Sequence, residues 1–134
     1  MKQAPFIAFV CEHGAAKSII AAAYFNKLAS EMDLDARAIA RGTSPDSEMS
    51  IRTVTGLRED GLSPTETIPQ KLSLAEIRSA HHVVTFCELP SEYRSDIPAE
   101  QWDDVPSVSK DYGTARDVIL SRLKTLMERM ISGQ

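Results

Sequence analysis

The sequence has few of the features that mark membrane-bound, nucleic-acid-binding or disulfide-stapled proteins. Its 134 residues include two cysteines, Cys11 and Cys87, which are too few for a disulfide framework. No stretch approaches the roughly 20 apolar residues of a membrane helix. The N-terminal MKQAPFIAFV is interrupted by Pro5 and is not typical of a signal peptide. We therefore expect a cytoplasmic protein with no membrane association and with both thiols reduced.

The charge balance is slightly acidic, with a formal net charge of -4. A protein whose main partner is nucleic acid usually carries a basic face, so we expect no nucleic acid partner. A small anionic ligand is still compatible with this balance, because one local site can be positive on an acidic protein. Length and composition, with 43% hydrophobic and 25% charged residues, indicate one globular domain over residues 1–134.

Predicted strands and helices alternate along the chain, which indicates an α/β fold with a mainly parallel sheet and helices on both faces. Strands are expected over residues 5–11, 34–42, 81–87 and, less clearly, 102–106. Helices are expected over residues 17–32, 44–61, 73–80 and 109–132, with a loop over 88–101. Ser47 is a candidate N-cap of the second helix and Gly61 its end, and Ser73 with Glu76 forms a candidate capping box.

Cys11 ends the first predicted strand, and the stretch CEHGAAKS leads from it directly into a helix. Ligands of open parallel sheets bind at the carboxyl ends of strands. Small residues leave backbone amides uncovered, a helix N-terminus is positive, and Lys17 adds a full charge. Such a setting favours the nucleophilic thiolate of a cysteine, to which Ser18 can donate a hydrogen bond. We interpret Cys11 as a nucleophile toward a tetrahedral oxyanion; the alternative is a buried structural cysteine before an ordinary turn.

The loop that is predicted to hold the anion comprises Glu12, His13, Gly14, Ala15, Ala16 and Lys17. Cys11, five residues, Lys17 and Ser18 resemble the Cys-x5-Arg-Ser signature of low-molecular-weight protein tyrosine phosphatases and the related thioredoxin-coupled arsenate reductases. Segments similar to that family occur along almost the whole chain: ARGTSPDSE (40–48), EDGLS (59–63), VVTFC (83–87) and WDDVPSVS (102–109). The resemblance implies a three-layer flavodoxin-like fold with a four-stranded parallel sheet in the order 2-1-3-4. It also implies a cysteine-dependent phosphomonoester hydrolase, with phosphate esters or phosphoproteins as substrates.

Two positions in the loop depart from the family pattern. Lys17 replaces an arginine whose planar guanidinium can contact two phosphate oxygens at once, whereas an ammonium is a point charge. Losing one such donor costs about 2.7–4 kcal/mol of transition-state stabilisation, so we expect slow phosphatase chemistry. Glu12 places a carboxylate beside the nucleophile, which opposes anion binding unless the side chain points away.

The general acid of the family is also missing. Its Asp-Pro pair corresponds to Ser107-Val108 here, and serine does not protonate a leaving oxygen near neutral pH. Asp103, Asp104 and Asp111 are the remaining candidates for this acid. Each of them is otherwise explained as a surface carboxylate or as a residue at the start of a helix.

Cys87 supports a second hypothesis, since the resemblance places it where the reductases carry their second redox cysteine. It would attack an adduct on Cys11 and form a disulfide, which thioredoxin or a small thiol would reduce, because the third cysteine of the relay is replaced by Arg94. The alternative for Cys87 is a small apolar residue at a strand end. A third hypothesis is a non-catalytic module that binds phosphate or phosphopeptides.

The remaining candidates outside the loop offer no second chemistry. His81 and His82 begin the strand that Cys87 ends, about 17–20 Å away, so we expect no metal site, and we expect no cofactor. Arg41 ends the second strand and either faces the same rim, supplying the missing guanidinium, or is solvated. Trp102 either lines the site or packs in the core.

Overall fold

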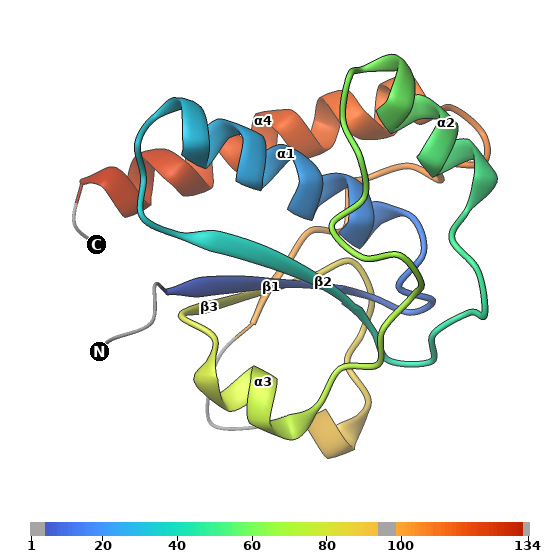
Figure 1. The fold of residues 1–134 in the computed structure, drawn as a ribbon. Coiled ribbons are helices and arrows are strands. Elements are labelled where there is room, and N and C mark those ends of the chain that lie inside the picture. The colour runs from blue at the N-terminus through green and yellow to red at the C-terminus, as the bar shows by residue number, and fades with distance from the viewer. Residues whose placement is uncertain (1–4, 94–98, 133–134) are drawn as a thin grey trace.

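The computed structural model describes residues 5–93 and 99–132 and has a parallel sheet between helices on its two faces (Figure 1). The sheet order is β2-β1-β3-β4, and each neighbouring pair is parallel. The strands are β1 (Phe6–Cys11), β2 (Arg37–Gly42), β3 (His82–Thr85) and β4 (Glu100–Gln101). This arrangement confirms the predicted flavodoxin-like sheet.

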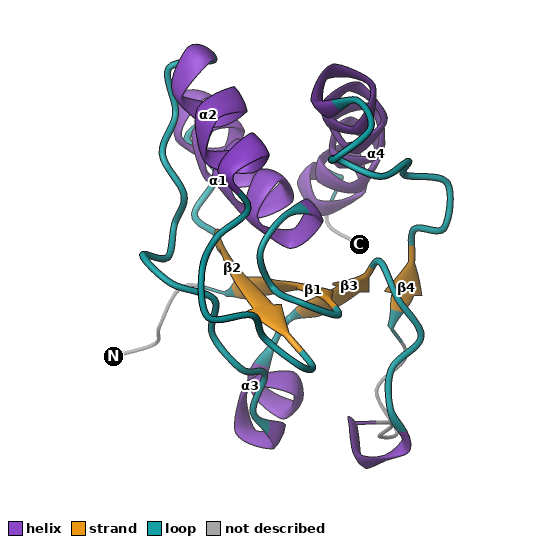
Figure 2. Ribbon diagram, turned by 90° about the vertical axis from the view of Figure 1, so that its right-hand side faces the viewer, coloured by secondary structure: helices purple, strands orange, loops and turns teal. Residues whose placement is uncertain are grey.

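Helices lie on both faces of the sheet (Figures 1 and 2). On the first face lie α1 (Lys17–Glu31), α2 (Ile51–Glu59) and α4 (Tyr112–Ile131). On the second face lies α3 (Leu74–Ser79), and a 3-10 turn, η1 (Ser91–Tyr93), precedes β4. Among the helices of the described ranges, none has the length and apolar character that crossing a membrane would require.

The apolar run of β1 explains why this strand lies at the centre. Phe9 packs on the side of α1 and α4, whereas Ala8 and Val10 belong to the apolar cluster on the side of α3. Because alternate residues of a strand point to opposite faces, a strand that is buried on both faces must be apolar throughout. The central position of β1 brings its C-terminal residue, Cys11, to the middle of the sheet edge.

The fourth strand differs from the prediction. It covers Glu100–Gln101, not residues 102–106, because Trp102 turns into the core. The Trp102 amide still donates to the Thr85 carbonyl at 2.8 Å. Its indole ring packs against Phe9 and Phe86, with centroids 5.8 and 5.7 Å apart.

The other differences concern helix ends and loops. The N-cap of α2 is Ser50, whose Oγ accepts from the Thr53 amide, so the prediction of Ser47 was wrong. Asp111 caps α4, which therefore begins later than residue 109. The capping box of α3 is confirmed. The predicted loop over 88–101 contains η1 and β4; its residues 94–98, like residues 1–4 of the N-terminal stretch, lie outside the described residues.

Candidate active site

A cavity of about 350 Å³ lies at the carboxyl end of β1, where the chain turns into α1. The described lining residues come from this turn, from the segment before α2, from the end of β3 and from the segment before α4. They are Cys11, Glu12, His13, Ala15, Ala16, Lys17, Asp46, Ser50, Phe86, Cys87, Ser107, Val108 and Ser109. The structure thus brings together at one cavity most of the predicted loop, the predicted nucleophile and the second cysteine.

Cys11 is almost enclosed at the base of this site, with 8% of its surface exposed. Its Sγ lies 3.0 Å from Oγ of Ser18, which is fully buried in the first turn of α1. No side chain caps the N-terminus of α1, and its first turn contains no acidic residue. The positive end of the helix dipole is therefore not compensated by the protein next to the thiol.

The backbone amides of residues 12–17 form no hydrogen bond with any other group in the described ranges. A buried amide without a partner is costly, and the great majority of such groups in proteins are satisfied. A run of free amides at a helix N-terminus matches the donor arrangement that binds phosphate and sulfate. These amides, with the Ser18 hydroxyl, can hold a tetrahedral anion above the Cys11 sulfur.

The loop depends on a close contact between two glycines. Gly14 has a φ of +63°, a left-handed conformation that favours glycine, and a Cβ there would lie 2.9 Å from the Gly42 amide nitrogen. Three amides of the segment after β2 donate to carbonyls of the loop: Thr43 to Cys11 at 3.2 Å, Ser44 to Glu12 at 2.8 Å and Asp46 to His13 at 3.0 Å. The two segments are therefore joined through their main chains.

Lys17 does not stand free in the cavity. Its Nζ donates to the Val105 carbonyl at 2.8 Å, which connects the start of α1 with the segment before α4. An ammonium has three donors, so two remain for an anion. This backbone contact is invisible in the sequence, because any residue at position 105 has a carbonyl.

His13 lies between two carboxylates at the mouth of the cavity. Its Nδ1 is 3.1 Å from Asp46 Oδ1, and its Nε2 is 3.9 Å from Glu12 Oε1. Asp46 was not among the site residues predicted from the sequence, although it lies in the ARGTSPDSE segment that supported the resemblance. The contact with Asp46 gives His13 a role in shaping the loop.

The three carboxylates considered as the general acid do not line the cavity. Asp104 is paired with Arg122 on α4, with an N···O distance of 2.9 Å, and the Arg122 hydrogen bond lowers its pKa. Asp111 caps α4, where hydrogen bonds from Thr114 lower its pKa. Asp103 is exposed in the segment before α4. These positions argue against the acid role for all three.

Cys87 lines the cavity as a half-buried free thiol. Burial raises its pKa to about 11, and the neighbouring Cys11 and Glu12 charges act in the same direction, while Lys17 opposes them. The Cys87 thiol is therefore protonated at neutral pH. Arg94, which stands where the reductases have a third cysteine, lies outside the described residues.

Two further predictions are settled by the packing. Arg41 forms ion pairs with Glu66 at 3.1 Å and Glu76 at 2.8 Å, and its side chain is 15% exposed, so it neither lines the cavity nor is solvated, and both interpretations of this residue were wrong. Trp102 is 1% exposed, so it packs in the core and does not line the site. Its indole donates to the Glu100 carboxylate at 2.8 Å.

Among the described residues, no group of three or more His, Cys, Asp or Glu is placed to hold a metal ion.

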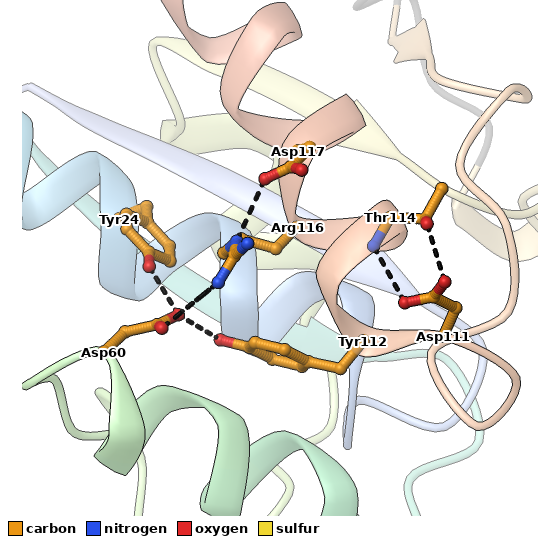
Figure 3. A network of polar contacts seen from close by, with 7 residues as sticks. All are labelled: Tyr24, Asp60, Asp111, Tyr112, Thr114, Arg116 and Asp117. Atoms are coloured by element: carbon orange, nitrogen blue, oxygen red, sulfur yellow. Dashed lines mark hydrogen bonds and ion pairs between the residues drawn. The ribbon is translucent and has the colours of Figure 1, made fainter.

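A polar network that the sequence analysis missed positions the helices around the site (Figure 3). Asp60, directly after α2, accepts hydrogen bonds from Tyr24 Oη at 2.6 Å and Tyr112 Oη at 2.9 Å, and Arg116 lies 3.1 Å from it. Burial raises the pKa of Tyr24 to about 12, and Asp60 adds to this effect. The network connects α1, α2 and α4, and residues at or just before the start of each of these helices line the cavity.

A sheet of this order, with a cysteine under free amides at a helix start, is the arrangement expected of a cysteine-based oxyanion site. The model of the low molecular weight phosphotyrosine protein phosphatase family matches residues 6–118, and the chain belongs to this family. The resemblance seen in the CEHGAAKS segment is thereby confirmed. No curated protein matches the sequence.

Solved structures of this family superpose on most of the chain. YfkJ from Bacillus subtilis aligns with a TM-score of 0.82 and 16% identity over 99% of both chains. Arsenate reductase from Archaeoglobus fulgidus aligns with a TM-score of 0.68 and 27% identity over 90% of this chain and 97% of that one. The thioredoxin-dependent arsenate reductase Cg_ArsC1' from Corynebacterium glutamicum aligns with a TM-score of 0.75 and 20% identity. The alignment covers 99% of this chain and 65% of that protein.

Proposed function

We propose that the protein is a cysteine-dependent phosphomonoester hydrolase. One observation carries the proposal: the Cys11 sulfur, hydrogen-bonded to Ser18, lies in a cavity where the amides of residues 12–17 have no partner among the described residues. Membership of a phosphotyrosine phosphatase family supports the same chemistry. In the first step the Cys11 thiolate attacks phosphorus, the P–O ester bond breaks, and the alcohol leaves with the electron pair. Water then attacks the cysteinyl-phosphate, which releases inorganic phosphate and restores the thiolate.

The protein stabilises this reaction with charge rather than with a general acid. The loop amides, the start of α1 and the two free donors of Lys17 surround the phosphoryl oxygens, where negative charge is held in the transition state. Because Asp104 and Asp111 are engaged elsewhere, the leaving oxygen takes its proton from water. Esters of acidic alcohols such as phenols are therefore better substrates than alkyl phosphates, and turnover is slow. The physiological substrate class is accordingly an aryl phosphate, such as phosphotyrosine.

The test is hydrolysis of p-nitrophenyl phosphate and of a phosphotyrosine peptide by the wild type and by Cys11→Ser. We expect slow release of phosphate by the wild type and none by the variant. Rapid-quench experiments with labelled substrate should trap a phosphocysteine on the wild type. Equal rates for the two proteins would refute the proposal. Binding of phosphate by Cys11→Ser without turnover by the wild type would instead indicate a phosphate- or phosphopeptide-binding module.

A second candidate, reduction of arsenate, is favoured by the presence of both thiols in the cavity. The Cys11 thiolate would displace water from arsenate, and Cys87 would attack the Cys11 sulfur. The S–As bond would break with its electron pair left on arsenic, which releases arsenite and a Cys11–Cys87 disulfide for thioredoxin or a small thiol to reduce. This function ranks second because the raised Cys87 pKa keeps its thiol protonated. An arsenate-dependent disulfide seen by mass spectrometry, lost in Cys87→Ser, would place it first.

A further inference from the structure

The mouth and the base of the cavity carry opposite charges. At the base lie the unpartnered amides, the start of α1 and Lys17. At the mouth lie the carboxylates of Glu12 and Asp46, whose side chains are 64% and 54% exposed. Both carboxylates line the cavity that holds Cys11, so a substrate bound there lies near two negative charges, which disfavours substrates that carry further negative charge.

Neither mouth carboxylate is neutralised by a permanent cation. Within the described ranges, neither Glu12 nor Asp46 pairs with lysine or arginine; their ionic neighbour is His13, at 3.9 and 3.1 Å. Lys17, the cation among the described lining residues, donates instead to the Val105 carbonyl. A positive group on the substrate would therefore meet two carboxylates that still lack a full counter-charge.

The main chain holds this arrangement in place. The Asp46 amide donates to the His13 carbonyl at 3.0 Å, and the Ser44 amide donates to the Glu12 carbonyl at 2.8 Å. The main-chain positions of both residues are thus held at the anion loop, close to Cys11. The charge at the mouth belongs to the proposed catalytic site and acts on the atoms next to the phosphoryl group.

We propose that Glu12 and Asp46 are specificity-determining residues that select phosphoryl substrates carrying a cationic group beside the phosphate, an inference that rests on the proposed function. The expected substrate is a phosphorylated side chain flanked by arginine or lysine. Exposed ion pairs contribute modestly, so we expect a preference of about tenfold for a basic over an acidic flank at low salt. The preference should shrink at 0.5 M salt, where the screening length falls to a few ångströms.

The experiment measures binding to Cys11→Ser, so that the result does not depend on turnover. Three phosphotyrosine peptides of equal length, flanked by arginine, alanine or aspartate, are titrated in 50 mM salt. We expect affinity to fall in that order, and the arginine-to-aspartate ratio to drop below about twofold when Glu12→Gln and Asp46→Asn are added. Asp35→Asn with Glu128→Gln removes the same formal charge from exposed positions outside the cavity and should leave the ratio unchanged.

The outcomes separate this inference from the proposed function. If the peptides bind without preference, or if the mouth variants keep the full ratio, the role of the two carboxylates is refuted while the anion site stands. If no peptide and no inorganic phosphate binds to Cys11→Ser, both fail. Phosphocholine serves as a further probe. If phosphocholine binds as tightly as the arginine-flanked peptide, the preference extends to small zwitterionic phosphoesters. If phosphocholine binds more weakly, the preference is one for peptides.

Discussion

The carboxylate of Glu100 links β4 to the rest of the fold, and Glu100→Gln tests how much it stabilises the protein. It accepts hydrogen bonds from Trp102 Nε1 at 2.8 Å, His82 Nε2 at 2.9 Å and Arg129 at 2.8 Å. Burial alone would raise the pKa of Glu100, but the hydrogen bonds from Trp102, Arg129 and His82 outweigh it. The net result lowers this pKa from its ordinary 4.5 to about 2.

The size of the Glu100 pKa shift determines how much Glu100→Gln is expected to destabilise the fold. A fall from 4.5 to about 2 corresponds to about 3.5 kcal/mol, at about 1.4 kcal/mol for each pH unit. Glu100 is 26% exposed, but Arg129 is 51% exposed, so solvent screens part of the interaction. We therefore expect Glu100→Gln to lower the free energy of unfolding at pH 7 by about 1.5–3 kcal/mol.

The direction of the Glu100 pKa shift determines how its contribution to stability changes with pH. The folded pKa lies below the unfolded one, so the ionised carboxylate stabilises the fold above about pH 4.5, and this contribution disappears as the pH falls toward 2. Urea denaturation followed by circular dichroism at pH 7, 5, 4 and 3 measures it. The difference between wild type and variant should be constant at pH 7 and 5 and shrink at pH 4 and 3.

The matched control is Glu31→Gln, which removes an exposed ion pair with Lys27 one helical turn away. Its effect should stay below about 0.5 kcal/mol. Two results would refute the reasoning about Glu100: a loss below about 0.5 kcal/mol at pH 7, or a loss that is as large at pH 3 as at pH 7.

Three other substitutions test the site and its supports. Lys17→Arg should raise kcat/KM for p-nitrophenyl phosphate roughly tenfold or more, because a guanidinium can contact two oxygens; an unchanged rate contradicts this. Gly14→Ala should abolish the stabilisation by phosphate seen in thermal melts, since its Cβ would lie 2.9 Å from Gly42, whereas Gly113→Ala, with its nearest neighbour at 3.5 Å, should not. Asp60→Asn should lower stability by about 1–3 kcal/mol in calorimetry and leave kcat changed less than KM; a neutral effect would deny the network a structural role.

The parts of the fold that follow from local patterns were predictable. The apolar run of β1, the alanine-rich α1 and the capping box of Ser73 and Glu76 are each determined by neighbours in the chain. Alternation of strands and helices then limits the topology, and the CEHGAAKS segment indicates which strand end carries the site. Cys11, Lys17 and Cys87 accordingly lie at one cavity, as expected.

The remaining features depend on contacts between distant segments. The strand β4 has two residues, too few for a periodic signal, and its end is set by the burial of Trp102. Arg41 stands at a strand end, as predicted, but two glutamates from other segments, Glu66 and Glu76, hold it. Asp60 looks like an ordinary residue after a helix until the fold brings two tyrosines and an arginine to it.

The contact of Gly14 with Gly42 has a consequence for how such a site can diverge. The amides of Thr43, Ser44 and Asp46 hold the loop through its carbonyls, so its curvature does not depend on the side chain at position 12. A different side chain at this position can thus change which substrate the site accepts, while the contact between Gly14 and Gly42 keeps the shape of the loop.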